Sequence, residues 1–327
     1  MTNDPWSNIE TPRANLNVRR VSATHPLPLY WGKDQNSACV FVVEIPADAA
    51  PAPKSLPNLV GVRVSLFQDK TAPKLVFVLA DAKDREIFFA LCMDLIHASE
   101  NADSSAAAVA IILRRLARWR EFLKRPHNET MTESRIKGLI GELLFLENTL
   151  AARFGWEHAV SFWKGPENAA QDFIVYDTAV EVKCQSGSSR PFVEIASVEQ
   201  LNSRLPRLYL VVHTLSSACK DDTDAITLNS LARRILTAME LASDSFRDAF
   251  ETLLFRAGWA PIPDYDEKAF RLVSTRAFEV RDGFPRLMPD TIPEGVEKIT
   301  YNLSLAALAP FSTSIEFTQT AKQGSLQ

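Results

Sequence analysis

Three charged side chains, Asp172, Glu181 and Lys183, lie in one short stretch that otherwise reads as apolar strand, DFIVYDTAVEVKC at residues 172–184. Carboxylates gathered at one place repel each other unless a cation lies between them. Mg²⁺ suits such a group, because it binds one or two carboxylates and completes its shell with waters and phosphate oxygens. The residue types therefore indicate a metal site. The alternative is a salt bridge between Lys183 and Asp172 on a solvated sheet face.

The spacing predicts how a strand hairpin would place these residues. A two-residue turn at residues 177–178 sets the antiparallel pairing. Lys183 then lies opposite Asp172, and Glu181 lies opposite Ile174. Because side chains alternate along a strand, Asp172, Glu181 and Lys183 share one face. A slip of one residue would turn Asp172 to the other face, so the prediction depends on the turn.

A helix before the hairpin contributes a further acid. The segment TMTESRIKGLIGELLFLENTLAARFG predicts a helix over residues 130–155, with Thr130 as N-cap, Glu133 at the third helical position and Gly155 as C-cap. Glu142 falls at the edge of the apolar stripe, one turn after a glycine that leaves space around it. The alternative is an ordinary glutamate at the boundary of the core.

Taken together, the segments GLIGELLFLE, FWKGPENAAQDFIVYDTAVEVKC and EIASVEQL resemble the PD-(D/E)XK nuclease superfamily. Within it, the chain looks like a family of bacterial PD-(D/E)XK motif proteins found among restriction-like defence genes. The resemblance covers roughly residues 130–215. Gln171 stands where the name of the superfamily has proline.

The resemblance implies a restriction-endonuclease-like mixed sheet flanked by helices, with one acid on a helix, Glu142, and the other site residues on adjacent strands. It implies that Asp172, Glu181 and Glu142 hold a metal ion, Mg²⁺ with Mn²⁺ as a substitute. Gln200 matches a glutamine that lies near the site and the nucleic-acid backbone in several related nucleases, although a lone glutamine is more often a helix-surface amide.

The implied chemistry is hydrolysis of a phosphodiester. A bound metal ion lowers the pKa of its water and withdraws charge from the phosphoryl oxygens. Lys183 can orient the attacking water and stabilise negative charge on the phosphate. We therefore expect a Mg²⁺-dependent endonuclease acting on DNA, as a component of a prokaryotic restriction or defence system. One alternative is a nuclease-fold subunit for DNA binding or assembly without activity of its own, and another is a scaffold with surface salt bridges.

A basic helix, RRLARWREFLKR at residues 114–125, precedes the expected site. Arginines beside an aromatic residue are typical of a surface that follows phosphates. The candidate nucleic-acid contacts are Arg114, Arg115, Arg118 and Lys124. The alternative is a solvated helix face that joins two domains.

Composition divides the chain into three parts. Residues 1–125 predict a β-rich unit that ends in the basic helix. Residues 126–250 read as a helix, three or four strands, a short helix, a strand and a helix, which predicts the nuclease-like core. Residues 251–327, punctuated by prolines, predict a strand-rich extension and a loose tail. The expected fold class is α/β, of the α+β kind.

The remaining features exclude several classes of protein. A net charge of −4 gives no general attraction to nucleic acid, so DNA contact needs a local basic patch. The longest apolar run, residues 106–113, is too short to span a membrane, and the polar N-terminus lacks a signal-peptide core. We expect a cytoplasmic protein. Because the chain has no G-x-x-x-x-G-K-[ST] loop, any ATP-dependent DNA translocation would belong to a partner. The expected partners are DNA and other subunits of a restriction or defence system that supply ATPase or modification activity.

Overall fold

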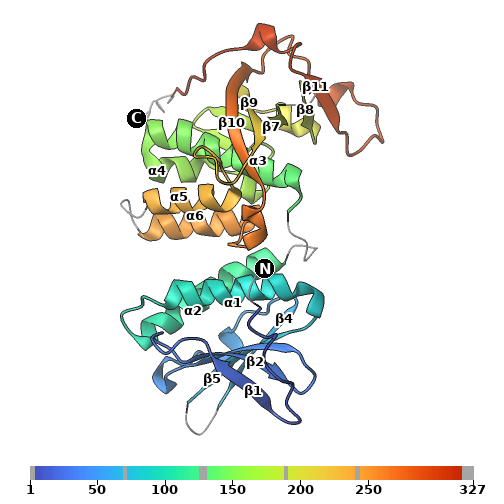
Figure 1. The fold of residues 1–327 in the computed structure, drawn as a ribbon. Helices are drawn as coiled ribbons and strands as arrows, with labels where there is room; N and C mark the ends of the chain where they lie inside the picture. Colours follow the sequence, from blue (N-terminus) through green and yellow to red (C-terminus); the bar gives the residue numbers. More distant parts are fainter. Residues whose placement is uncertain (1–3, 69–71, 125–130, 188–190, 240–243, 319–327) are drawn as a thin grey trace. The chain divides into compact units, whose positions relative to one another are not determined.

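The computed structural model describes residues 4–68, 72–124, 131–187, 191–239 and 244–318. The chain divides into two compact units, which we describe separately (Figure 1). The first unit is Met1–Thr130 with Gly258–Pro263, and the second is Met131–Ala257 with Asp264–Gln327. The predicted C-terminal extension therefore belongs mostly to the second unit. Thr130, the predicted N-cap, and Arg125 of the basic helix lie outside the described residues.

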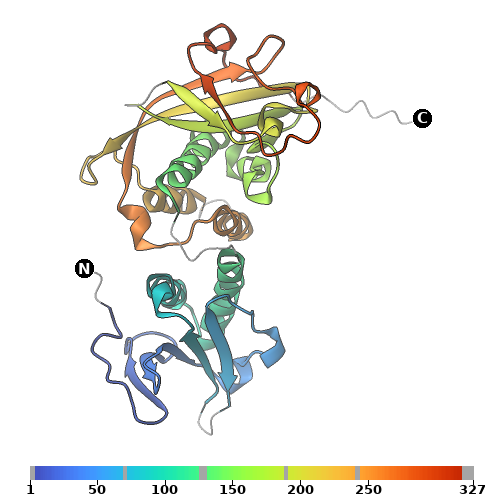
Figure 2. The same ribbon diagram turned by 90° about the vertical axis from the view of Figure 1, so that its right-hand side faces the viewer.

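The first unit is an antiparallel sheet with two helices on one face (Figures 1 and 2). The strand order is β1-β2-β3-β5-β4, for β1 (Leu16–Arg20), β2 (Leu29–Asp34), β3 (Cys39–Glu44), β4 (Val62–Phe67) and β5 (Lys74–Leu79). The helices are α1 (Arg85–Ser99) and α2 (Ser105–Leu123). Trp6 joins the layers, because its ring packs against Trp31 of β2 and Phe88 of α1.

The second unit is built on a mixed four-stranded sheet with the order β10-β9-β7-β6. The strands are β6 (Phe173–Val175), β7 (Thr178–Ser186), β9 (Arg207–Ala218) and β10 (Ala269–Glu279). β7 and β9 run parallel, and the other two pairs are antiparallel. β10, although it comes late in the chain, is an edge strand of this sheet, and for this reason the C-terminal residues pack with the core.

Helices cover one face of the mixed sheet. α3 (Glu133–Phe145) packs on β7, and it continues through a wider π-helical segment, Leu146–Ala151, into α4 (Ala152–Phe162). α5 (Leu228–Met239) packs on α3, and α6 (Asp244–Ala257) packs on α4 and α5. The structure thus has the mixed α/β architecture, with sheets flanked by helices, that the sequence predicts.

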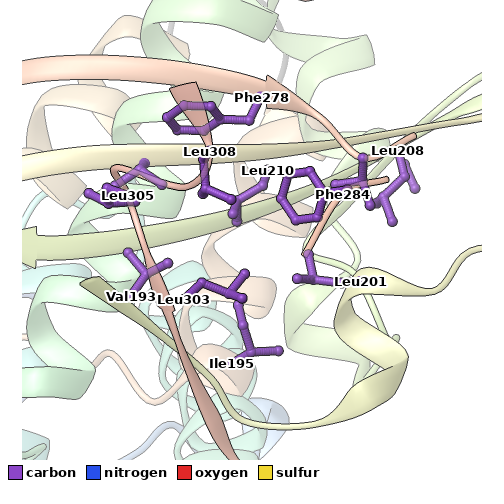
Figure 3. Close-up of a cluster of buried hydrophobic side chains, with 13 residues drawn as sticks. Val193, Ile195, Leu201, Leu208, Leu210, Phe278, Phe284, Leu303, Leu305 and Leu308 are labelled. Carbon is purple, nitrogen blue, oxygen red and sulfur yellow. The ribbon is translucent and has the colours of Figure 1, made fainter. Parts of the chain in front are cut away.

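A second layer covers the other face of the sheet. β8 (Phe192–Ile195) and β11 (Tyr301–Ser304) form a two-stranded antiparallel sheet, and the short helix η6 (Val198–Leu201) follows β8. Their apolar side chains pack with those of the mixed sheet into one buried cluster (Figure 3). Its members include Ala179, Val193, Ile195, Leu201, Leu208, Leu210, Val212, Phe278 and Leu303.

The helix before the hairpin begins two residues later than predicted. Its N-cap is Thr132, whose hydroxyl accepts the backbone N–H of Arg135 at 3.4 Å. Glu133 is therefore the first helical residue, and it pairs with Lys137 at 2.7 Å instead of closing a capping box. At the predicted end, Gly155 has φ 79° and ψ 163°, which lie outside the helical region and which glycine adopts without a side-chain clash. The helix therefore breaks at this glycine, as predicted, and a further helical stretch follows across a kink.

The hairpin is present, but its register differs from the prediction by two residues. Phe173 pairs with Val180 and Val175 with Thr178, so the turn is Tyr176–Asp177. Tyr176 takes the positive φ of 56° that such a tight turn needs, which leaves the β-branched Thr178 in the strand. Because a shift of two residues preserves the alternation of side chains, Glu181 and Lys183 still share a face, whereas Asp172 lies just before β6, so that alternation does not place it.

Within the described ranges, no helix is long and apolar enough to cross a membrane.

Candidate active site

The candidate site lies where β6 begins, beside the middle of β7. β6 has only three residues, and its ladder with β7 reaches Val180 and no further. Asp172, the residue just before β6, places its carboxylate where the next strand partner would be. Its Oδ2 accepts the backbone N–H of Val182 at 2.8 Å. A side chain thus replaces a backbone acceptor, and we use the word notch for this interruption of the β6–β7 ladder and the side chains around it, Glu142, Asp172, Glu181, Lys183 and Gln200.

Glu181 and Lys183 project from β7 at this notch. They lie on the face that also carries Ala179, which packs in the apolar cluster of Figure 3. Glu181 is 1% exposed, and the Lys183 ammonium lies 2.8 Å from its Oε1. Among the residues that the structure describes, neither oxygen of Glu181 accepts a hydrogen bond of good geometry, so that Oε2 is left without a partner and Oε1 is ion-paired with Lys183. A buried carboxylate oxygen without a partner is costly unless a cation or a proton satisfies it.

Gln200 meets Lys183 from the covering layer. Its side-chain oxygen Oε1 accepts a hydrogen bond from Lys183 Nζ at 3.0 Å and another from the backbone N–H of Ala196 at 2.8 Å. Lys183 is therefore held between one carboxylate and one amide oxygen. Gln200 lies on the short helix η6.

Glu142 reaches the same place from α3. The indole N–H of Trp163 donates to its Oε2 at 2.7 Å. Gly165, in the turn after α4, lies against both acids: a Cβ there would stand 2.9 Å from Glu142 Oε2 and 3.2 Å from Asp172 Oδ1. The backbone N–H groups of Lys164 and Gly165 both donate to the carbonyl oxygen of Asp172, at 2.7 and 3.0 Å. This turn thus fixes the spacing of the two carboxylates.

Burial dominates the electrostatics of the acids. It raises the pKa of Asp172 to about 6, against the opposing effects of the Val182 N–H and of Lys183. Burial, followed by the charge of Asp172, raises the pKa of Glu181 to about 8. The same two causes hold the pKa of Glu142 well above its ordinary value. Near neutral pH, the group therefore retains protons that a divalent cation could replace.

Lys183 keeps its charge in this environment. Burial alone would lower the pKa of its ammonium, but the Glu181 carboxylate, followed by Asp172 and Glu142, more than offsets burial and raises that pKa. The charged form of Lys183 is thus the stable one at neutral pH.

The donor set fits a hard divalent cation. Asp172 and Glu181 offer two carboxylates, one of them with a buried oxygen that has no hydrogen-bond partner in the described part of the chain. Mg²⁺ needs only one or two carboxylates, since waters and phosphate oxygens complete its shell. No three His, Cys, Asp or Glu side chains of the described residues are grouped closely enough to enclose a metal ion by themselves.

The structure brings five of the predicted residues together in the second unit: Glu142, Asp172, Glu181, Lys183 and Gln200. Sequence reasoning did not assign a role to Trp163 or Gly165, although both stand in the segment that carries the resemblance. The Gly-Pro pair after Trp163, WKGP, was an available signal, because it marks a tight turn directly before Asp172.

The predicted nucleic-acid contacts on α2 fall into two groups. Arg115 is buried, and its guanidinium grips Asp94 of α1, with Nε 2.8 Å from Oδ2 and Nη2 against Oδ1. Arg118 is 5% exposed. These two side chains do not face solvent, which corrects the expectation that they follow phosphates. Arg114 and Lys124 are exposed, and Lys124 pairs with Glu121 at 2.9 Å, so their part in DNA binding stays a prediction.

Trp119, the aromatic residue of the basic helix, is fully buried as well. Its indole N–H donates to Asp94 Oδ2 at 2.8 Å. It is thus part of the contact between α1 and α2 and presents no ring to a nucleic acid.

One comparison with known proteins identifies a family for this chain. A family model described as "Putative PD-(D/E)XK family member, (DUF4420)" matches residues 2–306. No curated protein and no solved structure matches the chain. The match covers both units and all five residues of the notch. The acids and the lysine that the sequence singles out thus lie in a mixed α/β fold that the family model spans almost entirely, and the chain belongs to this PD-(D/E)XK family.

Proposed function

We propose that the protein is a Mg²⁺-dependent nuclease that hydrolyses phosphodiester bonds of DNA. The observation that carries this proposal is the arrangement at the notch, where a buried carboxylate oxygen without a hydrogen-bond partner stands beside Asp172 and a charged lysine. Membership of a PD-(D/E)XK family supports it, since that superfamily consists mostly of nucleases.

Asp172 and Glu181 would hold the cation, with Mn²⁺ able to substitute for Mg²⁺, and Glu142 would bind through water or help to hold a second ion. The bound cation would supply a water of lowered pKa and would withdraw charge from the phosphate. The raised pKa values of Asp172 and Glu181 support a site that exchanges protons for a divalent ion.

Lys183 would act on the phosphate and the attacking water. Its ammonium is fixed between Glu181 Oε1 and Gln200 Oε1, so that little reorganisation is needed when negative charge develops nearby. Trp163 holds Glu142 through the indole N–H, which keeps this acid at the site although it comes from the helical layer.

The protein would work as a component of a prokaryotic restriction or defence system in the cytoplasm, where its DNA substrate is found. Other subunits would supply ATPase or modification activity. Arg114 and Lys124 are the exposed candidates on α2 for contacts with DNA phosphates.

A second candidate function is a nuclease-fold subunit that binds DNA or assembles with partners and does not cut. One observation favours it: within the described residues, no three potential ligand side chains are close enough to enclose a metal ion. A cleavage assay decides between the two.

The test uses the full chain together with the proteins that its neighbouring genes encode, supercoiled plasmid and Mg²⁺ or Mn²⁺. We expect Lys183→Ala and Asp172→Asn each to slow cleavage by about 100-fold or more, because each removes an interaction that acts in the transition state. Lys220→Ala is the matched control, since this lysine also pairs with a glutamate, Glu267, but lies outside the notch. Equal cleavage by wild type and both site variants would overturn the proposal in favour of the binding subunit.

A further inference from the structure

Gln171, the residue next to Asp172, makes a contact that the proposed chemistry leaves unexplained. Its side chain is 6% exposed, and its Nε2 donates to the carbonyl oxygen of Glu199 at 2.6 Å. The carbonyl oxygens of Asn202 and Gln200 lie 3.3 and 3.5 Å from the same nitrogen. The amide nitrogen of Gln171 is thus within hydrogen-bond distance of three carbonyl oxygens at the end of η6. The last carbonyl groups of a helix have no hydrogen-bond partner within the helix.

The short helix η6 carries the group that touches Lys183. Gln200 Oε1 accepts from Lys183 Nζ, and it also accepts the N–H of Ala196. Gln171 therefore connects the chain segment that bears Asp172 to the turn that holds Lys183. The side-chain hydrogen bonds of Gln171 go to backbone carbonyls of this turn.

We propose that Gln171 is a positioning residue: by capping η6 it fixes Gln200 and, through Gln200, the direction of the Lys183 ammonium. This inference rests on the proposed nuclease function for its effect on catalysis. It also gives a reason for the departure from the superfamily pattern at this position, because proline has no side-chain donor and could not make this contact.

Two further bonds hold η6 from its other side. Arg286 Nη1 donates to the carbonyl of Leu201 at 2.5 Å, and Asn202 Nδ2 donates to the carbonyl of Leu287 at 2.9 Å. Loss of the Gln171 cap should therefore loosen the turn without unfolding it, so the role of Gln171 can be tested in a folded protein.

The experiment compares Gln171→Leu and the isosteric Gln171→Glu with wild type. Gln185→Leu is the matched control, because Gln185 also donates one side-chain bond, to Thr214 at 2.8 Å, but does not contact η6. The first readout is hydrogen exchange of the Ala196 amide, followed by NMR without metal or DNA. We expect exchange about five- to ten-fold faster in both Gln171 variants, as for loss of one hydrogen bond, and no change in the control.

The second readout is steady-state cleavage of DNA by the complete system. We expect both Gln171 variants to lower kcat by about ten-fold with KM unchanged, as for other residues that orient a ligand or a catalytic group. Unchanged Ala196 exchange would overturn the positioning role, whatever the cleavage rate. Faster exchange with an unchanged kcat would overturn the link to catalysis. If wild type does not cut at all, the nuclease proposal fails, and Ala196 exchange still decides whether Gln171 positions Gln200.

Discussion

Each unit of the chain buries an ion pair, and the two pairs differ in how completely their carboxylates are satisfied. In the first unit, both oxygens of Asp94 are engaged, by the guanidinium of Arg115 and by the indole of Trp119. In the second unit, Lys183 contacts only Oε1 of Glu181, and the buried Oε2 has no hydrogen-bond partner among the described residues.

This difference separates a structural pair from a candidate site. A buried pair in which both carboxylate oxygens accept hydrogen bonds serves to hold two helices together. A buried carboxylate with an unused oxygen costs stability in the absence of a ligand, so it points to a ligand that the fold is built to receive. The basic helix is an example. Its sequence suggested a phosphate-binding surface, but Arg115 and Trp119 both bind the buried Asp94 and so have a structural role.

The largest expected effect on stability comes from breaking the buried pair of Arg115 and Asp94. Arg115→Met leaves Asp94 buried without its counter-ion, and we expect a loss of about 3–5 kcal/mol in the free energy of unfolding. Urea denaturation of the full chain measures this loss. Arg120→Met is the control, because Arg120 is an exposed arginine of the same helix that pairs with its neighbour Glu121. Similar stability of the two variants would contradict the structural role assigned to Arg115.

Two acids of the notch, Asp172 and Glu181, should make the stability of the protein depend on pH. The pKa values of Asp172 and Glu181 are raised by folding, to about 6 and about 8, so the folded state binds more protons than the unfolded state above about pH 4. Without metal, the stability that these two groups contribute should be fully present below about pH 4 and should be lost progressively as pH rises toward 8. The total loss should be on the order of a few kcal/mol.

Two additions sharpen this measurement. Glu181→Gln should flatten the upper part of the pH profile, because it removes the group with the higher of the two pKa values. Mn²⁺ should restore stability mainly at the alkaline end, where the carboxylates are free to bind it. If stability depended on pH with the same slope in wild type and in Glu181→Gln, the raised pKa assigned to Glu181 would be wrong.

A smaller effect is expected at the glycine between the acids. A Cβ on residue 165 would stand only 2.9 Å from Glu142 Oε2, so we expect Gly165→Ala to destabilise the protein by about 1–3 kcal/mol and to weaken Mn²⁺ binding. Gly138→Ala is the control, because a Cβ there meets nothing within 4 Å and alanine favours the helix. Thermal unfolding and calorimetry measure both variants. Equal stability and equal Mn²⁺ affinity of Gly165→Ala and Gly138→Ala would argue against close packing at Gly165.

The smallest effect concerns the exposed part of the basic helix. Arg114→Glu combined with Lys124→Glu should leave folding unchanged and should lower the salt dependence of DNA binding, by roughly one unit of log–log slope for each DNA phosphate that the variant no longer neutralises. Fluorescence anisotropy over a range of salt concentrations tests this prediction. An unchanged slope would leave α2 with a purely structural role.

Much of the hairpin could be predicted from its residues, and the reasons for the errors are physical. Alternation of side chains placed Glu181 and Lys183 on one face whatever the register. The position of the turn depended on Tyr176 accepting a positive φ, which is uncommon for a bulky residue and has no clear sequence signal. Asp172 was expected to pair across the hairpin, but it lies outside β6 and replaces a strand partner instead.

Contacts between distant segments were harder to foresee. Asp94 lies 21 residues before Arg115, on another helix, so the pattern of the basic helix alone could not reveal the pair. The contact between Trp163 and Glu142 likewise depends on how the turn after α4 folds back on α3. The sequence supplied the residue types at the site, whereas tertiary packing determined which of them meet.

The late position of β10 and β11 in the chain has a consequence for synthesis. The site residues of the notch lie between residues 142 and 200, but the apolar cluster on the face that carries Glu181 and Lys183 includes Phe278 of β10, an edge strand of the mixed sheet, and Leu303 of β11, in the layer that covers it. Because a chain emerges from the ribosome N-terminus first, the charged strand exists for some time before its cover is made. The surroundings of the site are thus completed only after β10 and β11 have been synthesised, and a ribosome-bound chain truncated before residue 268 should carry the site residues without forming the finished site.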